Sequence, residues 1–186
     1  MAIRNILRED DPFLAKKSRD IDTFNRRLHT LLDDMRQTML DAGGIGLAAP
    51  QVGVLRRAIL IADLSDEDEE NENNDEDYEV IELVNPEIIE IEGTQTANEG
   101  CLSIPGKCGV VTRPFAVKVK AQDRYGNIFD MIFEDVMARA ICHEVDHLNG
   151  ILYTAVAERM LTKEEMDELD REEEERKTGK RSKRKN

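Results

Sequence analysis

The sequence predicts an α+β fold, with helices kept apart from the strands along the chain. Apolar residues recur at helical spacing in residues 22–40 and 135–148. In shorter runs they alternate with polar residues, most clearly in residues 115–121. A chain of 186 residues is also long enough to bury a substantial core. We therefore expect one main domain in which a sheet packs against separate helices.

The first predicted helix covers residues 22–40, with Asp22 as its expected N-cap. Its apolar side chains share one face and comprise Phe24, Leu28, Leu31, Leu32, Met35 and Met39. Two glycines follow it as stop signals. Residues 44–53 come next, and they contain too much glycine for a helix. Pro50 within them argues against a central strand.

The remaining elements follow in order. Strands are predicted at residues 57–62, 80–84, 88–92, 115–121 and 128–133, with a hairpin turn at residues 123–127. Residues 65–78 lack apolar periodicity and are expected to form a solvated loop. A second helix is predicted at residues 135–148 and a third, very polar one at residues 162–175, before a disordered basic tail.

Charge is distributed unevenly along the chain, whose formal net charge is -14 and whose sequence pI is near 4.7. Residues 66–79 carry ten acidic and no basic side chains, and residues 163–175 contribute a net charge of -7. Residues 176–186 carry seven basic and no acidic side chains, which leaves -4 for the rest. The body is therefore an ordinary, mildly acidic domain, and only the basic end is suited to binding nucleic-acid phosphates.

Several classes of protein are excluded by the composition. No apolar run approaches the 18 or more residues of a membrane span, and charges occur throughout the first twenty residues, where a signal peptide would be apolar. We expect a cytoplasmic protein without membrane contact. The three cysteines, Cys101, Cys108 and Cys142, leave at least one unpaired, so a disulfide framework is not expected.

Residues 143–147 read His-Glu-Val-Asp-His, an H-E-x-x-H motif in the second predicted helix. Residues four apart lie on one helix face, about 6 Å apart along the axis, so His143 and His147 can bind one metal ion. Glu144 is turned about 100° away, where it can take a proton from water without competing for the metal. The third histidine, His29, lies off the apolar face of the first helix and is expected at the surface.

The third metal ligand distinguishes between classes of enzyme. A metzincin protease would have a histidine six residues after His147, but that residue is Tyr153. Other H-E-x-x-H proteases use a downstream glutamate, for which the candidates are Glu158, Glu164 and Glu165.

A cysteine is the other candidate. One thiolate and two imidazoles form an ordinary ligand set for zinc or iron and leave one position for water. Cys142 is turned away from the ligand face and is expected in the core. Spacing alone does not choose between Cys101 and Cys108.

Three segments together resemble the peptide deformylase family. They read Gly-Ile-Gly-Leu-Ala-Ala-Pro-Gln at residues 44–51, Glu-Gly-Cys-Leu-Ser at residues 99–103, and the motif at residues 143–147. They occur in the family's order and at about its spacing. The resemblance implies antiparallel sheets packed around a central H-E-x-x-H helix, with a C-terminal helix.

The resemblance also implies the domain organisation. The catalytic domain would cover residues 1–162, with an acidic insert at about residues 65–79. Residues 163–186 would form a charged helix and a partly disordered basic tail.

The resemblance also assigns roles. The metal ligands would be Cys101, His143 and His147. The catalytic residues would be Glu144 as the base, with the Gln51 carboxamide and the Leu102 backbone N–H as donors to the oxyanion. Substrate would be bound by Ile45, Gly46, Glu99 and Gly100. Cys108 and Cys142 would lie outside the ligand set.

A methionine side chain in the substrate needs an apolar pocket. Val136, Arg139 and Ala140 are candidates for its wall, because they precede His143 by one to two helical turns. Arg139 fits there only if its methylene stem lines the wall while its head stays in water. Glu99 could pair with Arg113 behind the ligands, or the two could form an ordinary surface pair or none.

The family removes the formyl group from N-formylmethionyl chains and releases formate. The resemblance therefore implies a metal-dependent amide hydrolase that acts on newly synthesised polypeptides. It implies one divalent metal ion, Fe²⁺ in the native enzyme, with Zn²⁺, Ni²⁺ or Co²⁺ as alternatives. The expected partners are N-formylmethionyl nascent peptides and, through the basic tail, the ribosome. We expect a monomer.

Two other functions remain open from the residues. An endoprotease could share the H-E-x-x-H motif, and a binding module could keep the fold without activity. The presence of Cys101, Glu144 and Gln51 argues against the binding module, because an inactive relative is free to lose them.

Overall fold

The fold is described by a computed structural model, which covers residues 2–64, 79–169 and 171. These residues form two antiparallel sheets with helices packed against them, so the predicted α+β class is confirmed. The larger sheet has the order β1-β2-β3-β6-β7. Its strands are β1 (Gly46–Ala48), β2 (Ala58–Ala62), β3 (Val80–Glu92), β6 (Ala116–Gln122) and β7 (Ile128–Glu134).

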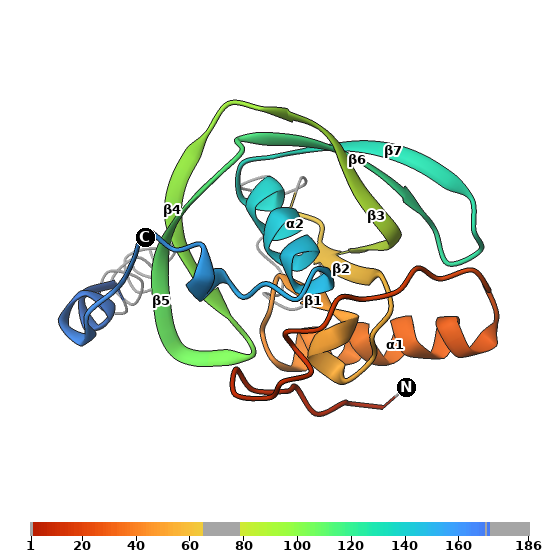
Figure 1. The fold of residues 1–186 in the computed structure, drawn as a ribbon, viewed down its shortest axis with the longest axis horizontal. Coiled ribbons are helices and arrows are strands. Elements are labelled where there is room, and N and C mark those ends of the chain that lie inside the picture. Colours follow the sequence, from red (N-terminus) through yellow and green to blue (C-terminus); the bar gives the residue numbers. More distant parts are fainter. Residues whose placement is uncertain (1, 65–78, 170, 172–186) are drawn as a thin grey trace, which may run out of the picture.

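The smaller sheet has the order β4-β5-β8. It comprises β4 (Gln95–Cys101), β5 (Ile104–Arg113) and the short β8 (Arg159–Met160). Helix α2 (Asp135–Leu148) lies at the centre of the molecule, with β4 and β5 on one side and β3, β6 and β7 on the other (Figure 1). Helix α1 (Arg26–Asp41) lies across the larger sheet's β1 and β2.

One hydrophobic core holds α2 against the larger sheet. Ala138, Ile141 and Leu148 of the helix are fully buried and belong to one cluster with residues of β2, β3, β6 and β7. Burying a side chain as large as leucine stabilises the fold by about 1.5–3 kcal/mol. Cys142 belongs to the same cluster, as predicted. With α2 fixed in the core, His143 and Glu144 line a pocket beside it.

Helix α1 begins later than predicted. Asn25 is its N-cap, and the Asn25 side-chain oxygen accepts hydrogen bonds from the N–H groups of Arg27 and Leu28. The expectation of a cap at Asp22 is therefore wrong. His29 is half-buried, because its Nε2 lies 2.9 Å from the carbonyl oxygen of Arg124 and its ring packs edge-on against Tyr125. His29 is thus partly exposed at the surface, as expected, and makes these two contacts as well.

The strands differ from the prediction in two ways. Residues 80–84 and 88–92 form one strand, β3, with a register shift after Val84. Strands β1, β4 and β5 were not predicted. β1 is an edge strand, which agrees with the argument against a central strand in residues 44–53. Between β1 and β2, residues Ala49–Val52 form a 3-10 helix, η1. A second, η2 (Tyr153–Ala155), follows α2.

The charged segments are described only in part. Residues 163–169 are helical, and Thr162 and Glu165 hydrogen-bond to each other's backbone N–H groups as in a capping box. Residues 172–175 of the predicted third helix, residues 65–78 of the acidic insert and the basic tail lie outside the described residues. No helix in the described part of the chain is long and apolar enough to cross a membrane.

Candidate metal centre and active site

Cys101, His143 and His147 meet at one point of the structure. Cys101 ends β4, and the two histidines lie one turn apart on α2. One potential ligand atom from each of the three side chains lies within 4.8 Å of the others. The Cys101 Sγ is 3.2 Å from the His147 Nε2, and the two imidazole rings are 5.0 Å apart. Among the described residues, this is the group of donors that could hold a metal ion.

The other candidates for the third ligand lie elsewhere. Glu158 is exposed and accepts a hydrogen bond from Thr112, and Glu165 pairs with Arg159. Cys108 is not part of the group, and burial raises the pKa of its thiol, which disfavours the thiolate that a metal needs. Spacing did not choose between Cys101 and Cys108. In the structure, β4 places Cys101 beside the two histidines, and Cys108 is outside the group.

The three donors have the chemistry and the spacing of a metal site. Tetrahedral zinc binds nitrogen at about 2.0 Å and sulfur at about 2.3 Å, so its ligand atoms lie between about 3 and 4 Å apart. Burial lowers the pKa of His147 to about 3, which keeps its imidazole neutral, as a ligand must be. His143 uses Nδ1 to contact Glu99, so its Nε2 is left for a metal. The residues therefore fit a divalent ion.

A buried network of charges lies behind His143. The Glu99 carboxylate is 3.0 Å from the His143 Nδ1 and accepts two hydrogen bonds, of 2.9 and 3.1 Å, from Arg113. Arg113 also donates to Asp146 at 2.6 Å. Burial alone would raise the pKa of Glu99, but the hydrogen bonds from His143 and Arg113 hold it below its ordinary value. Glu99 is thus an anion that fixes the orientation of His143, and its pair with Arg113 is not a surface pair.

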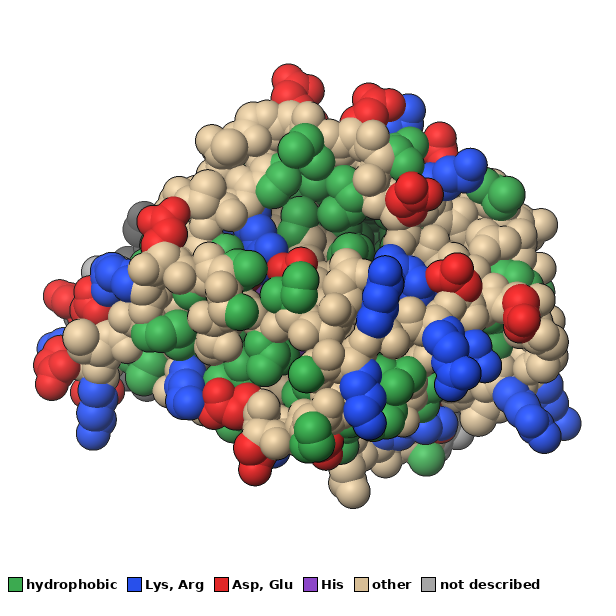
Figure 2. All heavy atoms as spheres, viewed as in Figure 1, with side chains coloured by type: hydrophobic (Ala, Val, Ile, Leu, Met, Phe, Trp, Pro, Cys, Tyr) green, Lys and Arg blue, Asp and Glu red, His purple; other side chains and the backbone are tan. Residues whose placement is uncertain are grey.

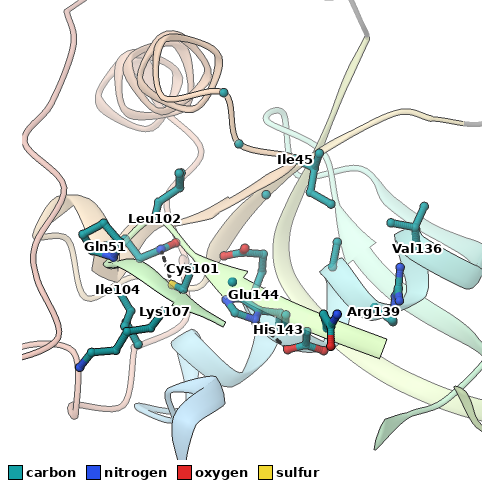
Figure 3. A pocket seen from close by; sticks show the side chains of 18 of the residues that line it. Ile45, Gln51, Cys101, Leu102, Ile104, Lys107, Val136, Arg139, His143 and Glu144 are labelled. Carbon is teal, nitrogen blue, oxygen red and sulfur yellow. Dashed lines mark hydrogen bonds and ion pairs between the residues drawn. The ribbon is translucent and has the colours of Figure 1, made fainter. Parts of the chain in front are cut away.

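Glu144 is buried beside the donors and faces the pocket (Figure 3). Among the described residues its Oε2 has no hydrogen-bond partner. Burial raises the pKa of Glu144 to about 7, and only a protonated His143 opposes this effect. A carboxylate with a pKa near neutrality is suited to accept and return a proton.

Gln51 is held so that its amide group points to the same site. The side-chain oxygen accepts the N–H of Ala48 at 2.8 Å. The Nε2 then lies 3.5 Å from the Cys101 Sγ and 3.2 Å from the Ser103 Oγ. Gln51 is only 1% exposed, so it is not the solvated side chain that a glutamine after proline most often is.

The N-terminal arm, residues 2–20, fixes the neighbouring backbone. Leu7 donates its N–H to the carbonyl oxygen of Gln51, and Glu9 donates to that of Ser103. The Arg8 guanidinium donates to the carbonyl oxygen of Leu102 at 3.2 Å. The arm therefore joins the two segments that carry the predicted oxyanion donors, Gln51 and Leu102.

A pocket of about 430 Å³ opens onto these side chains. All seven residues predicted to bind substrate line it, namely Ile45, Gly46, Glu99, Gly100, Val136, Arg139 and Ala140. In Figure 3, Gln51 and Cys101 lie at one end, and Val136 and Arg139 at the other. The face of the molecule in Figure 2 is hollowed near its centre, where hydrophobic side chains gather. The structure thus brings the predicted residues together, and their roles stay predictions.

One contact was not predicted. The ring of Tyr153 stacks on the imidazole of His143, with centroids 5.8 Å apart and planes inclined by 26°. Tyr153 is fully buried and belongs to η2, just after the turn that ends α2. No sequence pattern indicates such a contact, because it depends on how the chain returns after Gly150.

Known proteins share both sequence and structure with this chain. The family model for polypeptide deformylase matches residues 3–163. A peptide deformylase of Caldicellulosiruptor bescii is 49% identical and covers 90% of this chain and 93% of its own. One from Lachnoclostridium phytofermentans is 54% identical over 82% of this chain and 88% of its own. The crystal structure of a peptide deformylase from Legionella pneumophila superposes with a TM-score of 0.75, at 38% identity, over 96% of this chain and 98% of that one.

The match spans the three motifs and nearly the whole described part of the chain. The chain belongs to the polypeptide deformylase family, and it is a metal-dependent hydrolase that removes the N-formyl group from the amino-terminal methionine of newly made polypeptides and releases formate.

Proposed function

We propose that the deformylation reaction is carried out by Glu144, Gln51 and Leu102 beside a metal ion held by Cys101, His143 and His147. The observation that carries this assignment is the convergence of the three donor atoms within 4.8 Å at the pocket that Glu144 faces. A divalent ion bound there supplies a Lewis acid that lowers the pKa of water and polarises the formyl oxygen.

Glu144 moves the proton in this scheme. It accepts a proton from the water molecule whose oxygen attacks the formyl carbon. The carbon–nitrogen bond then breaks, and Glu144 returns the proton to the departing amine nitrogen. The immediate products are formic acid and a free amine; the acid ionises to formate and the amine takes up that proton, so atoms and charges balance. The raised pKa of Glu144, about 7, supports both steps, because the group can hold or release a proton near neutral pH.

Gln51 and Leu102 stabilise the negative charge that develops on the formyl oxygen. The Gln51 Oε1 accepts the N–H of Ala48, the Gln51 Nε2 donates to Ser103, and the Leu102 carbonyl oxygen accepts a hydrogen bond from Arg8. The Nε2 donates to Cys101 and Ser103 in this structure, so one of these hydrogen bonds is exchanged for the formyl oxygen when substrate binds. One oxyanion donor is commonly worth about 3 kcal/mol.

The substrate main chain lies between two strand edges. β1 is the edge of the larger sheet and β4 is the edge of the smaller one, and residues of both line the pocket. An extended peptide can pair with such an edge through its backbone, with Ile45 and Gly46 as partners. The methionine side chain lies against Val136, Ala140 and the stem of Arg139. A deformylase structure from Acinetobacter baumannii, 32% identical with a TM-score of 0.73, holds Met-Ala-Ser, which supports this class of ligand.

The native metal in this proposal is Fe²⁺, with Zn²⁺, Ni²⁺ or Co²⁺ as substitutes. A set of one thiolate and two imidazoles suits each of these ions. The decisive experiment purifies the protein without oxygen, loads it with Fe²⁺ or Ni²⁺ and offers a formyl-Met tripeptide. We expect stoichiometric formate. A protein with bound metal that releases none contradicts the assignment, and internal cleavage of an unblocked protein favours an endoprotease.

We further propose a monomeric, cytoplasmic enzyme whose catalytic domain covers residues 1–162 and whose basic tail contacts the ribosome. The seven basic residues at 176–186 support this contact, because clustered Lys and Arg side chains bind RNA phosphates. Deleting residues 176–186 should weaken ribosome binding and flatten its dependence on salt. Unchanged affinity at all salt concentrations would contradict the contact.

A further inference from the structure

Arg139 is a cation in the pocket for which the described residues supply no anionic partner. It is half-buried on α2 and lines the cavity. In the part of the chain that the structure describes, no ion pair or hydrogen bond engages its guanidinium. The other cation that lines the cavity, Lys107, is held by Glu9 at 2.6 Å. A partly desolvated guanidinium is costly unless something pairs with it, so Arg139 is available to a ligand.

The position of Arg139 indicates which part of a substrate it meets. Arg139 lies one helical turn from His143, about 6 Å along the axis. In Figure 3, it lies at the end of the pocket opposite Gln51 and Cys101. In an extended peptide, the first and third side chains point to the same side and lie about 7 Å apart. If the first side chain packs beside Ala140, the third reaches the Arg139 head group.

We propose that Arg139 forms a carboxylate-binding subsite that favours Asp or Glu as the third residue of the formylated substrate. This inference rests on the proposed function, because it needs the peptide to lie along the pocket with its formyl group at the metal. A guanidinium can donate two parallel hydrogen bonds to one carboxylate, which makes it a better partner than a lysine would be. A partly exposed pair of this kind should change kcat/KM by about 1.5-fold to fivefold.

The test compares two peptides that differ only in charge, formyl-Met-Ala-Glu-amide and formyl-Met-Ala-Gln-amide. For the metal-loaded wild type at low salt, we expect a kcat/KM ratio of about 1.5 to 5 in favour of glutamate, falling as salt screens the pair. Arg139→Gln should bring the ratio to about one. Arg139→Glu should invert the ratio, so that the glutamine peptide reacts faster than the glutamate peptide. The same variant should favour a peptide with lysine as its third residue. Because both peptides are measured on the same protein, any general loss of folding or activity cancels.

A matched variant controls for the change in net charge. Arg26→Gln removes an exposed arginine at the start of α1, and it should keep the wild-type ratio. Equal rates for the two peptides in the wild type would overturn the subsite. A glutamate preference that survives Arg139→Gln, or one seen only with formyl-Met-Glu-Ala-amide, would overturn it too. No formate from any peptide would contradict the proposed function itself, and the subsite with it.

Discussion

The backbone of Gly46 lies directly against the carboxylate of Glu144. A Cβ on residue 46 would lie 2.6 Å from the Glu144 Oε1 and 3.0 Å from its Cγ. Gly46 is not among the glycines with a positive φ, so the glycine is required by the close approach and not by the backbone conformation. A side chain on residue 46 would therefore have to displace the Glu144 side chain from its position beside β1.

Replacing Gly46 by alanine should displace Glu144. We expect Gly46→Ala to lower kcat/KM by at least about tenfold, because a general base must stay within hydrogen-bond reach of its proton. Metal content, measured by elemental analysis, should not change. Gly44→Ala is the matched comparison: its Cβ would meet only the end of the Leu102 side chain, which can rotate, so its effect should be smaller. Equal losses in the two variants would contradict the explanation.

Removing the Glu144 carboxylate should separate metal binding from turnover. Glu144 is outside the group of three donors, so Glu144→Ala should bind metal as the wild type does. Deformylation should fall by about 10²- to 10⁴-fold, the usual contribution of a general acid–base group. Formate release and metal content measure the two effects. Glu87→Ala, which removes an exposed carboxylate on β3, serves as the control. Retained turnover in Glu144→Ala would exclude Glu144 as the base.

Sequence periodicity predicted α1 and α2 because each has one apolar face. It predicted β2, β3, β6 and β7 of the larger sheet because they place apolar residues in its core. It missed β4, which reads Gln-Thr-Ala-Asn-Glu-Gly-Cys and has little apolar character. This strand is held by backbone pairing with β5, while Glu99 and Cys101 point to the site. A strand whose side chains serve a site lacks the alternation that identifies ordinary strands.

The resemblance to a known family predicted the site residues better than residue spacing alone did. The choice of Cys101 came from resemblance, because no local pattern separates it from Cys108. The network of Glu99, Arg113 and Asp146 could not be predicted with certainty, since it joins β4, β5 and α2. It depends on a register in which Gln95 pairs with Arg113. Such register is set by tertiary packing that a single sequence does not encode locally.

Arg113 should contribute strongly to stability, because it is a buried cation between two carboxylates. It is 8% exposed and joins Glu99 to Asp146. Arg113→Met would leave these carboxylates without their cation, and breaking such a buried pair costs about 3–5 kcal/mol of unfolding free energy. Metal affinity should fall by about 10- to 100-fold as His143 loses its support. Urea denaturation of the metal-free protein and metal titration measure the two effects.

Lys118→Met is the control for Arg113→Met. Lys118 pairs with Glu90 on the outside of the sheet, where Glu90 is 68% exposed. The loss of such a pair should cost less than about 1 kcal/mol. A similar loss of stability in the two variants would show that the Arg113 network is not a stabilising feature.

Asp34 on α1 fastens the N-terminal arm. It is 6% exposed, and it accepts the N–H of Ala2 at 2.7 Å and two hydrogen bonds from Arg4, at 3.2 and 2.9 Å. The Ala2 N–H and the Arg4 guanidinium together outweigh burial and hold the pKa of Asp34 below its ordinary value. The ionised form is therefore the one that stabilises the fold.

The resulting pH dependence has a definite sign. A group with a lowered pKa in the folded state stabilises the protein above its unfolded pKa, about 3.9 for aspartate, and the stabilisation is lost as the pH falls through the folded value. Asp34→Asn should therefore reduce unfolding free energy by about 1–3 kcal/mol at neutral pH, since hydrogen bonds to a charged group are lost. The difference from wild type should shrink below about pH 4. Denaturation series at pH 7, 5 and 3 test this, with the exposed Asp41→Asn as control. A difference that stays constant down to pH 3 would contradict a stabilising role for the Asp34 charge.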